Sequence, residues 1–167
     1  QPLEAGGPGG PRHGRRVNPM KKHRKTGGWI FKRCLELCVV SPSAVMIHQS
    51  ILDQVGLFDE SFPACEDYDL WLRIACRYPI GLLPEFYMVR YGGHAGQLSS
   101  TIPTLDLYRI QAIEKILGSG VLPAGQYTAA VEELKRKCSV YGNGCLKRGK
   151  QEEGERILAI PQKYCRS

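Results

Sequence analysis

The sequence lacks the features that assign a protein to a membrane or a secretory route. No apolar run reaches the roughly 18–20 residues of a membrane span. The longest candidate, residues 34–47, carries Glu36 and Pro42. The opening residues are rich in Gly and Pro and have no charged patch followed by an apolar core, so no secretory signal is evident. A cytoplasmic location is therefore the default expectation.

The sequence also lacks any Cys-x-x-Cys pair among its 7 cysteines. Cys34 and Cys38 are one helical turn apart, and Cys138 and Cys145 are two turns apart. Structural zinc sites use tight paired spacings that converge on four ligands. Free thiols in a reducing compartment, packed as small apolar groups, explain this pattern better than a zinc site does.

Acidic residues are scarce at one end of the chain. Residues 1–50 hold nine Lys or Arg and two acids, whereas residues 51–167 hold fourteen of each, so the net charge of +7 belongs to the first segment. A solvated basic arm fits this distribution better than a nucleic-acid interface. We therefore expect no nucleic-acid partner and leave open contacts of the arm with phosphates or a membrane surface. Residues 1–16 contain five Gly and three Pro, which predicts a disordered tail.

The hydrophobic pattern changes along the chain from mixed to helical. A compact apolar run at residues 43–48 predicts a buried strand, and residues 80–83 and 86–91 are strand-like. The turn expected at residues 57–60 points Phe58 inward. Helical periodicity is expected over residues 28–37, 49–55, 66–78, 105–117, 126–141 and 154–159, with a helical-hairpin turn at 146–150. The fold class predicted on this basis is α/β, followed by a helical extension.

The most informative stretch is GLFDESFPACEDYDLWLR, residues 56–73. It places the adjacent carboxylates Glu66 and Asp67 at the start of a helix. One of them can serve as a general base that deprotonates a hydroxyl. The alternative is structural, because acids at a helix N-terminus complement the helix dipole. General physical chemistry leaves both interpretations open.

This stretch resembles the acceptor-side signature of family 2 glycosyltransferases, in which a G-x-F-D-E turn precedes E-D-x-D-x-x-x-R. The resemblance extends over residues 17–101 and includes SPSAVMIH, QSILDQVG and the segment ending in YGGH. It implies the GT-A (nucleotide-diphospho-sugar transferase-like) fold. It also implies that Asp67 is the base in an inverting displacement, with Glu66 beside it.

The resemblance further implies a nucleotide-diphosphate sugar as donor and a glycan or lipid-linked acceptor, as in polysaccharide or cell-envelope glycan synthesis. A divalent metal, Mg²⁺ or Mn²⁺, is expected on the donor phosphates. His94 is a candidate for the metal or the diphosphate, with a surface-loop histidine as the alternative. Gln97 is a candidate substrate contact. Trp71 either stacks on a sugar or packs in the core, and Arg73 is expected to pair with Asp69 rather than with the acceptor.

The donor half expected of such an enzyme has no counterpart here. The one Asp-x-Asp, residues 67–69, lies inside the acceptor motif, and a nucleotide-binding half needs about three βα units, ~90 residues, upstream. We therefore expect a tail (1–16), the C-terminal part of an incomplete GT-A domain (17–101) and a helical extension (102–167). Such a chain should transfer little sugar alone. The alternative is a non-catalytic remnant or binding module.

Overall fold

The computed structural model describes residues 26–85, 87 and 105–164, and these residues are built from helices and turns. The α-helices are α2 (Phe31–Glu36), α3 (Gln49–Val55), α4 (Glu66–Ala75), α6 (Leu105–Gly118), α7 (Ala124–Lys147) and α8 (Gln151–Ala159). Two 3-10 turns, η1 (Pro42–Ala44) and η2 (Ile160–Tyr164), complete the elements.

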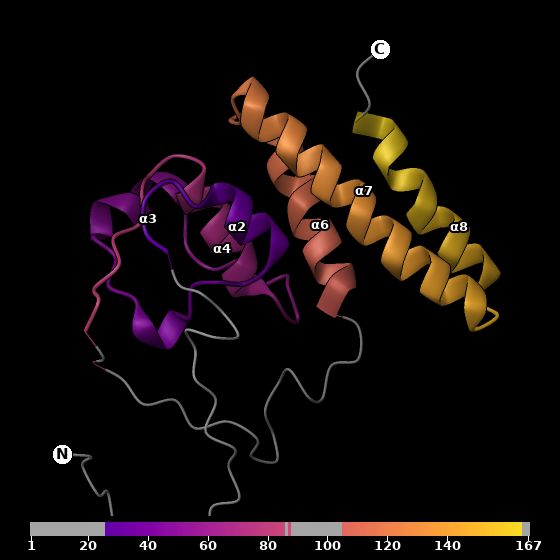
Figure 1. Ribbon diagram of the computed structural model, residues 1–167, viewed down its shortest axis with the longest axis horizontal. Helices are drawn as coiled ribbons and strands as arrows, with labels where there is room; N and C mark the ends of the chain where they lie inside the picture. The colour runs from indigo at the N-terminus through magenta and orange to yellow at the C-terminus, as the bar shows by residue number, and fades with distance from the viewer. Residues whose placement is uncertain (1–25, 86, 88–104, 165–167) are drawn as a thin grey trace, which may run out of the picture.

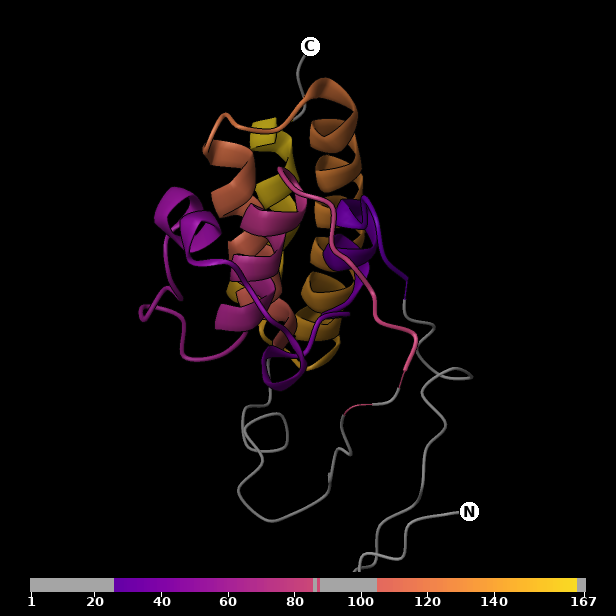
Figure 2. The same cartoon turned by 90° about the vertical axis from the view of Figure 1, so that its left-hand side faces the viewer.

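The helices form two neighbouring groups that share one core. In Figure 1 the short helices α2, α3 and α4 lie together, and α6 stands between them and the long helix α7, with α8 running back along α7. Figure 2 shows the same arrangement from the side of the short helices, where α4 lies across α6 and α2 lies against α7. One hydrophobic cluster runs through both groups, from Ile30 to Ile160.

The α/β fold class predicted from the sequence, an incomplete GT-A domain, is wrong for the described part of the chain. These residues contain no strand, and their β-pairing is one isolated antiparallel bridge between Gly28 and Ile80. The run at 43–48 begins with the 3-10 turn η1 and continues as an extended segment in which Met46 is 98% exposed. A strand needs a hydrogen-bonding neighbour along its length, and this segment has none among the described residues.

The segment near residue 80 departs from its prediction for a similar reason. Ile80 exchanges two hydrogen bonds with Gly28, at 2.7 and 2.9 Å, and the pairing stops there. Pro84 lacks the N–H that a continued ladder requires. Residue 86 and residues 88–91, the second predicted strand except Tyr87, lie outside the described residues, as do the tail 1–16 and the predicted boundary at 101/102.

The predicted helices are confirmed, with shifted ends. Helix α3 covers residues 49–55 as expected, its first turn capped by the His48 ring, which accepts from the Ser50 N–H at 3.3 Å. Gly56 follows it with φ of 82°, a left-handed angle that glycine adopts without strain. Helix α4 ends at Ala75, three residues before the expected end. Helices α7 and α8 begin earlier than expected, and α7 ends later.

One assignment of burial is corrected by the structure. Helix α2 buries Phe31, Cys34 and Leu35, and Ile30 just before it is also buried, whereas Trp29 is 68% exposed. Phe58, expected to point inward, is 45% exposed. No described helix is long and apolar enough to cross a membrane.

The hairpin of α7 and α8 depends on two glycines that face each other. A Cβ added at Gly154 would lie 2.5 Å from Leu146 Cδ2 and 3.0 Å from the Gly142 carbonyl oxygen. A Cβ added at Gly142 would lie 2.7 Å from Leu158 Cγ and 3.1 Å from the Gly154 carbonyl oxygen. The close approach of the two helices therefore requires hydrogen at both positions.

We predict that Gly154→Ala lowers the free energy of unfolding by about 1–3 kcal/mol, because the methyl group overpacks the helix contact. Gly125→Ala is the matched control, since a Cβ at Gly125 meets nothing within 4 Å. The control should be neutral or stabilising by up to about 1 kcal/mol, the helix-propensity difference. Urea unfolding followed by circular dichroism measures both. Equal stability of the two variants would contradict the tight crossing.

Candidate acceptor site around the start of helix α4

The turn between α3 and α4 is organised by Asp59. Its Oδ1 accepts hydrogen bonds from the Ser61 backbone N–H at 3.0 Å and from the Ser61 hydroxyl at 2.6 Å. Its carbonyl oxygen accepts from the Phe62 N–H at 3.1 Å. An aspartate that binds backbone two residues ahead fixes a tight turn. The F-D-E part of the motif is therefore a structured turn.

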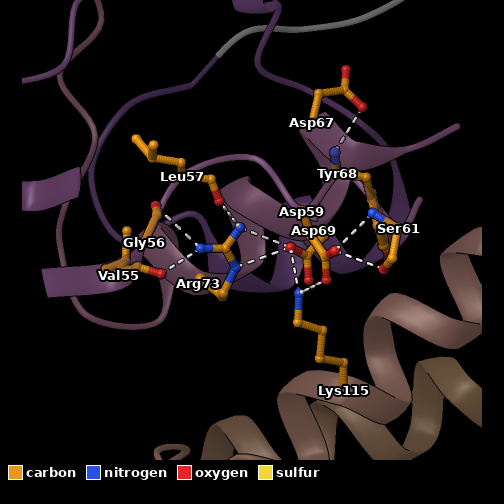
Figure 3. Close-up of polar contacts among 10 residues, drawn as sticks. All are labelled: Val55, Gly56, Leu57, Asp59, Ser61, Asp67, Tyr68, Asp69, Arg73 and Lys115. Atoms are coloured by element: carbon orange, nitrogen blue, oxygen red, sulfur yellow. Dashed lines mark hydrogen bonds and ion pairs between the residues drawn. The ribbon is translucent and has the colours of Figure 1, made fainter. Parts of the chain in front are cut away.

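Arg73 joins this turn to helix α4. Its guanidinium donates to Asp69 Oδ2 from Nε at 3.0 Å and from Nη2 at 2.8 Å (Figure 3). It also donates to three successive carbonyl oxygens at the end of α3, those of Val55, Gly56 (3.3 Å) and Leu57 (2.8 Å). The planar fork of arginine suits this multiple contact. The expected pairing of Arg73 with Asp69 is confirmed.

Lys115, on helix α6, completes the cluster. Its Nζ donates to Asp59 Oδ2 at 2.7 Å and to Asp69 Oδ2 at 3.0 Å, and it lies 5.3 Å from the centroid of the Phe62 ring. Asp69 is 1% exposed, and a buried carboxylate needs such partners. The hydrogen bond from Lys115, with those from Ser61, holds the pKa of Asp59 well below its usual range.

Asp67 lies outside this cluster. Its Oδ1 accepts from the Tyr68 N–H at 2.7 Å, and its Oδ2 accepts from the Cys38 thiol at 3.2 Å. Figure 3 shows its carboxylate directed away from Asp59, Asp69 and Lys115. Asp67 and Glu66 are both half-buried, and no ion pair engages either of them within the described ranges. At the first turn of α4, two carboxylates are thus without an ion pair to any described Lys or Arg.

The residue before these carboxylates has an unusual backbone. Cys65 has φ of 65°, and among the described residues no other non-glycine residue has a positive φ. This left-handed conformation costs a side-chain-bearing residue about 1–3 kcal/mol, and such residues cluster at functional sites. The Cys65 thiol donates to the Leu105 carbonyl oxygen at 3.6 Å, which fastens the start of α4 to the start of α6.

The remaining predicted site residues are placed differently. Trp71 is 2% exposed in the core, which favours the packing alternative over sugar stacking. Its indole N–H has no hydrogen-bond partner among the described residues. His94 and Gln97 lie outside the described residues, so their roles stay predictions. A hollow lined by charged side chains of α2 and α7, including Lys32 and Arg136, contains none of the predicted site residues.

The described residues do not fit the divalent metal that the resemblance implies. Nowhere in the described ranges do three His, Cys, Asp or Glu side chains converge on one point. Asp67 and Asp69 match the Asp-x-Asp sequence of a metal motif. However, Asp69 forms ion pairs with Arg73 and Lys115, and the Asp67 carboxylate is directed away from Asp69. Within the described ranges, the site therefore consists of acid, thiol and basic side chains.

Sequence reasoning missed Cys38 and Lys115. Cys38 lies 29 residues before Asp67, and Lys115 lies 46 residues after Asp69, with no local pattern linking either pair. Comparison of the chain with protein-family models, curated proteins and solved structures gave no match.

The contact between Cys38 and Asp67 predicts that the Cys38 thiol reacts slowly with alkylating reagents. Burial raises the pKa of the Cys38 thiol, and the Asp67 carboxylate raises it further. Because the thiolate is the reactive form, Cys38 should react with iodoacetamide only at a pH higher than the one at which an ordinary cysteine reacts. Asp67→Asn removes the negative charge, so we expect alkylation of Cys38 about tenfold faster at mildly alkaline pH.

Glu66→Gln is the matched control, because the Cys38 thiol donates its hydrogen bond to Asp67 and not to Glu66. Peptide-level mass spectrometry resolves Cys38 from the other cysteines. An unchanged rate in Asp67→Asn, or an equal acceleration in Glu66→Gln, would show that the carboxylate does not lie at the thiol.

Proposed function

We propose that this chain supplies the acceptor side of an inverting glycosyltransferase, in which Asp67 is the general base. The observation that carries the proposal is the different use of the motif carboxylates. Asp59 and Asp69 are bound by Lys115, and Asp69 also by Arg73. Asp67 has no ion pair with the described part of the chain and accepts two neutral donors. A carboxylate that no described cation binds can accept a proton from a hydroxyl. Glu66 shares this property, and the resemblance in the motif assigns the role of base to Asp67.

In the proposed reaction, the acceptor hydroxyl donates its hydrogen bond to Asp67. Its oxygen forms a bond to the anomeric carbon of the donor sugar as the bond from that carbon to the diphosphate oxygen breaks. The anomeric configuration is inverted, the diphosphate leaves with the nucleotide, and the hydroxyl proton ends on Asp67. The Tyr68 N–H, 2.7 Å from Oδ1, orients the carboxylate and leaves Oδ2 toward Cys38 and the acceptor.

The surroundings of Asp67 support this role in two ways. The first turn of α4 presents the positive end of its dipole to the two carboxylates, which is an electrostatically favourable position for acidic side chains. The left-handed Cys65 fixes the backbone immediately before them. We further propose a cytoplasmic location, which the six free thiols among the described cysteines support, since reducing compartments keep thiols free.

A second function, oligosaccharide binding without transfer, is favoured by one specific observation. Among the described residues, no three metal-ligating side chains lie together, so they form no site for a metal that would bind a donor diphosphate. In this function Glu66 and Asp67 act as hydrogen-bond acceptors for sugar hydroxyls. The two functions share the binding surface and differ in turnover.

Binding is tested first, with the 167-residue chain. Amide spectra are recorded during titration with cellobiose, lactose, chitobiose and a mannose disaccharide at millimolar concentrations. We expect at least one sugar to shift the amides of residues 65–68, because Glu66 and Asp67, which have no ion pair within the described ranges, lie there. Failure of every sugar to shift these amides would contradict both functions.

Transfer is tested with nucleotide-diphosphate sugars and Mg²⁺ or Mn²⁺, using this chain alone and together with a donor-binding polypeptide. We expect little turnover by the chain alone. In the preparation that transfers sugar, Asp67→Asn should lower kcat by about 10²–10⁴-fold, the usual contribution of a general base, with donor affinity retained. Glu66→Gln is the control and should do less. Near-normal kcat in Asp67→Asn would reject the assignment of the base.

A further inference from the structure

We propose that Lys115 is a positioning residue of the acceptor site and that it holds residues 59–69 in the geometry that presents Glu66 and Asp67. The proposal rests on the proposed function for its consequence in sugar binding. It extends that function to helix α6, which lies outside the motif. Figure 3 shows Lys115 reaching from α6 into the motif cluster.

Lys115 acts on the motif at two points. Its Nζ is 2.7 Å from Asp59 Oδ2 in the turn and 3.0 Å from Asp69 Oδ2 in α4. The two carboxylates therefore meet at one ammonium group. Without the lysine, their like charges favour separation of the turn from the helix. The chain between them contains Cys65, Glu66 and Asp67.

Helix α6 holds the same segment at another place. The Leu105 carbonyl oxygen, at the first residue of α6, accepts from the Cys65 thiol at 3.6 Å. The start of α6 thus contacts the residue before Glu66, while Lys115 contacts residues on either side of the two carboxylates. One rigid helix therefore fixes the segment at both of its ends and near its middle.

A second ion pair of helix α6, between Glu114 and Lys163, is an ordinary surface contact and serves as the comparison. Lys163 lies 3.8 Å from Glu114, and its side chain is 67% exposed. Such exposed pairs contribute little to stability. Lys115, by contrast, binds an aspartate that is 1% exposed. Asp69 also keeps Arg73, so loss of Lys115 should loosen the turn without unfolding the chain.

The experiment compares Lys115→Met, Lys115→Arg and the control Lys163→Met in the full chain. Backbone hydrogen exchange is measured over residues 57–68, together with global stability and the affinity for a sugar that binds the wild type. In Lys115→Met we expect exchange of this segment to accelerate about tenfold more than exchange of α7 and α8. Cys38 alkylation should also accelerate, because Asp67 moves from the thiol. Sugar affinity should fall by about tenfold, and Lys115→Arg should restore most of it.

Unchanged exchange in residues 57–68, or acceleration equal to that of α7 and α8, would overturn the proposal. So would a Lys115→Met protein that binds sugar like Lys163→Met. If Lys115→Met does not fold, Asp59→Asn replaces it, because it weakens the contact to the turn and keeps the pair of Lys115 with Asp69. The same local loosening is then expected, and its absence overturns the proposal.

The two proposals fail in different ways. If the wild type binds no sugar at residues 65–68, the acceptor function fails. The exchange and alkylation data then still decide whether Lys115 positions this segment. If the wild type binds sugar and the segment is unaffected in Lys115→Met, the acceptor function stands and the positioning role is rejected.

Discussion

The buried carboxylate of Asp69 is the constraint on which the site depends. A charge that is 1% exposed is stable in a protein interior only when cations and hydrogen-bond donors surround it. Arg73 supplies two of these donors from one turn further along α4, and Lys115 supplies the third from α6. Because Arg73 also binds the carbonyl oxygens at the end of α3, satisfying Asp69 fixes the relative positions of α3, α4 and α6.

Within one short motif, this arrangement separates the acids that form ion pairs from an acid that can contact a ligand. Asp59 and Asp69 share the ammonium group of Lys115, so both are committed to holding the turn against the helices. Asp67, between them, points the other way and meets a backbone N–H and a thiol. Cys65, just before Glu66 and Asp67, has a left-handed backbone. Such a strained conformation persists only where the surrounding contacts fix it. The cluster around Asp69 therefore holds the segment that carries Asp67.

The helices were predictable from sequence because their signals are local. Helix α3 has a polar residue before it and a glycine after it, and α4 has an apolar periodicity and an acidic first turn. The strands predicted at residues 43–48 and 80–83 were wrong because a strand depends on a distant neighbour, and Gly28 offers Ile80 only one bridge among the described residues. Within the site, the pairing of Arg73 with Asp69 followed from their spacing of four residues. The contacts of Asp67 with Cys38 and of Asp69 with Lys115 did not, because tertiary packing alone brings those residues together.

The helical architecture corrects the fold class without removing the basis of the functional proposal. The turn, Arg73, Asp69 and the start of α4 are connected by contacts within residues 55–73, and none of these contacts uses a strand. Function belongs to such local sites more than to the fold that carries them. Contacts from outside the motif come from the Cys38 thiol, from the Leu105 carbonyl oxygen and, at the buried Asp69, from Lys115 of helix α6. The proposed action on sugars rests on the carboxylates at the start of α4, and Lys115 of α6 contacts the chain on both sides of them.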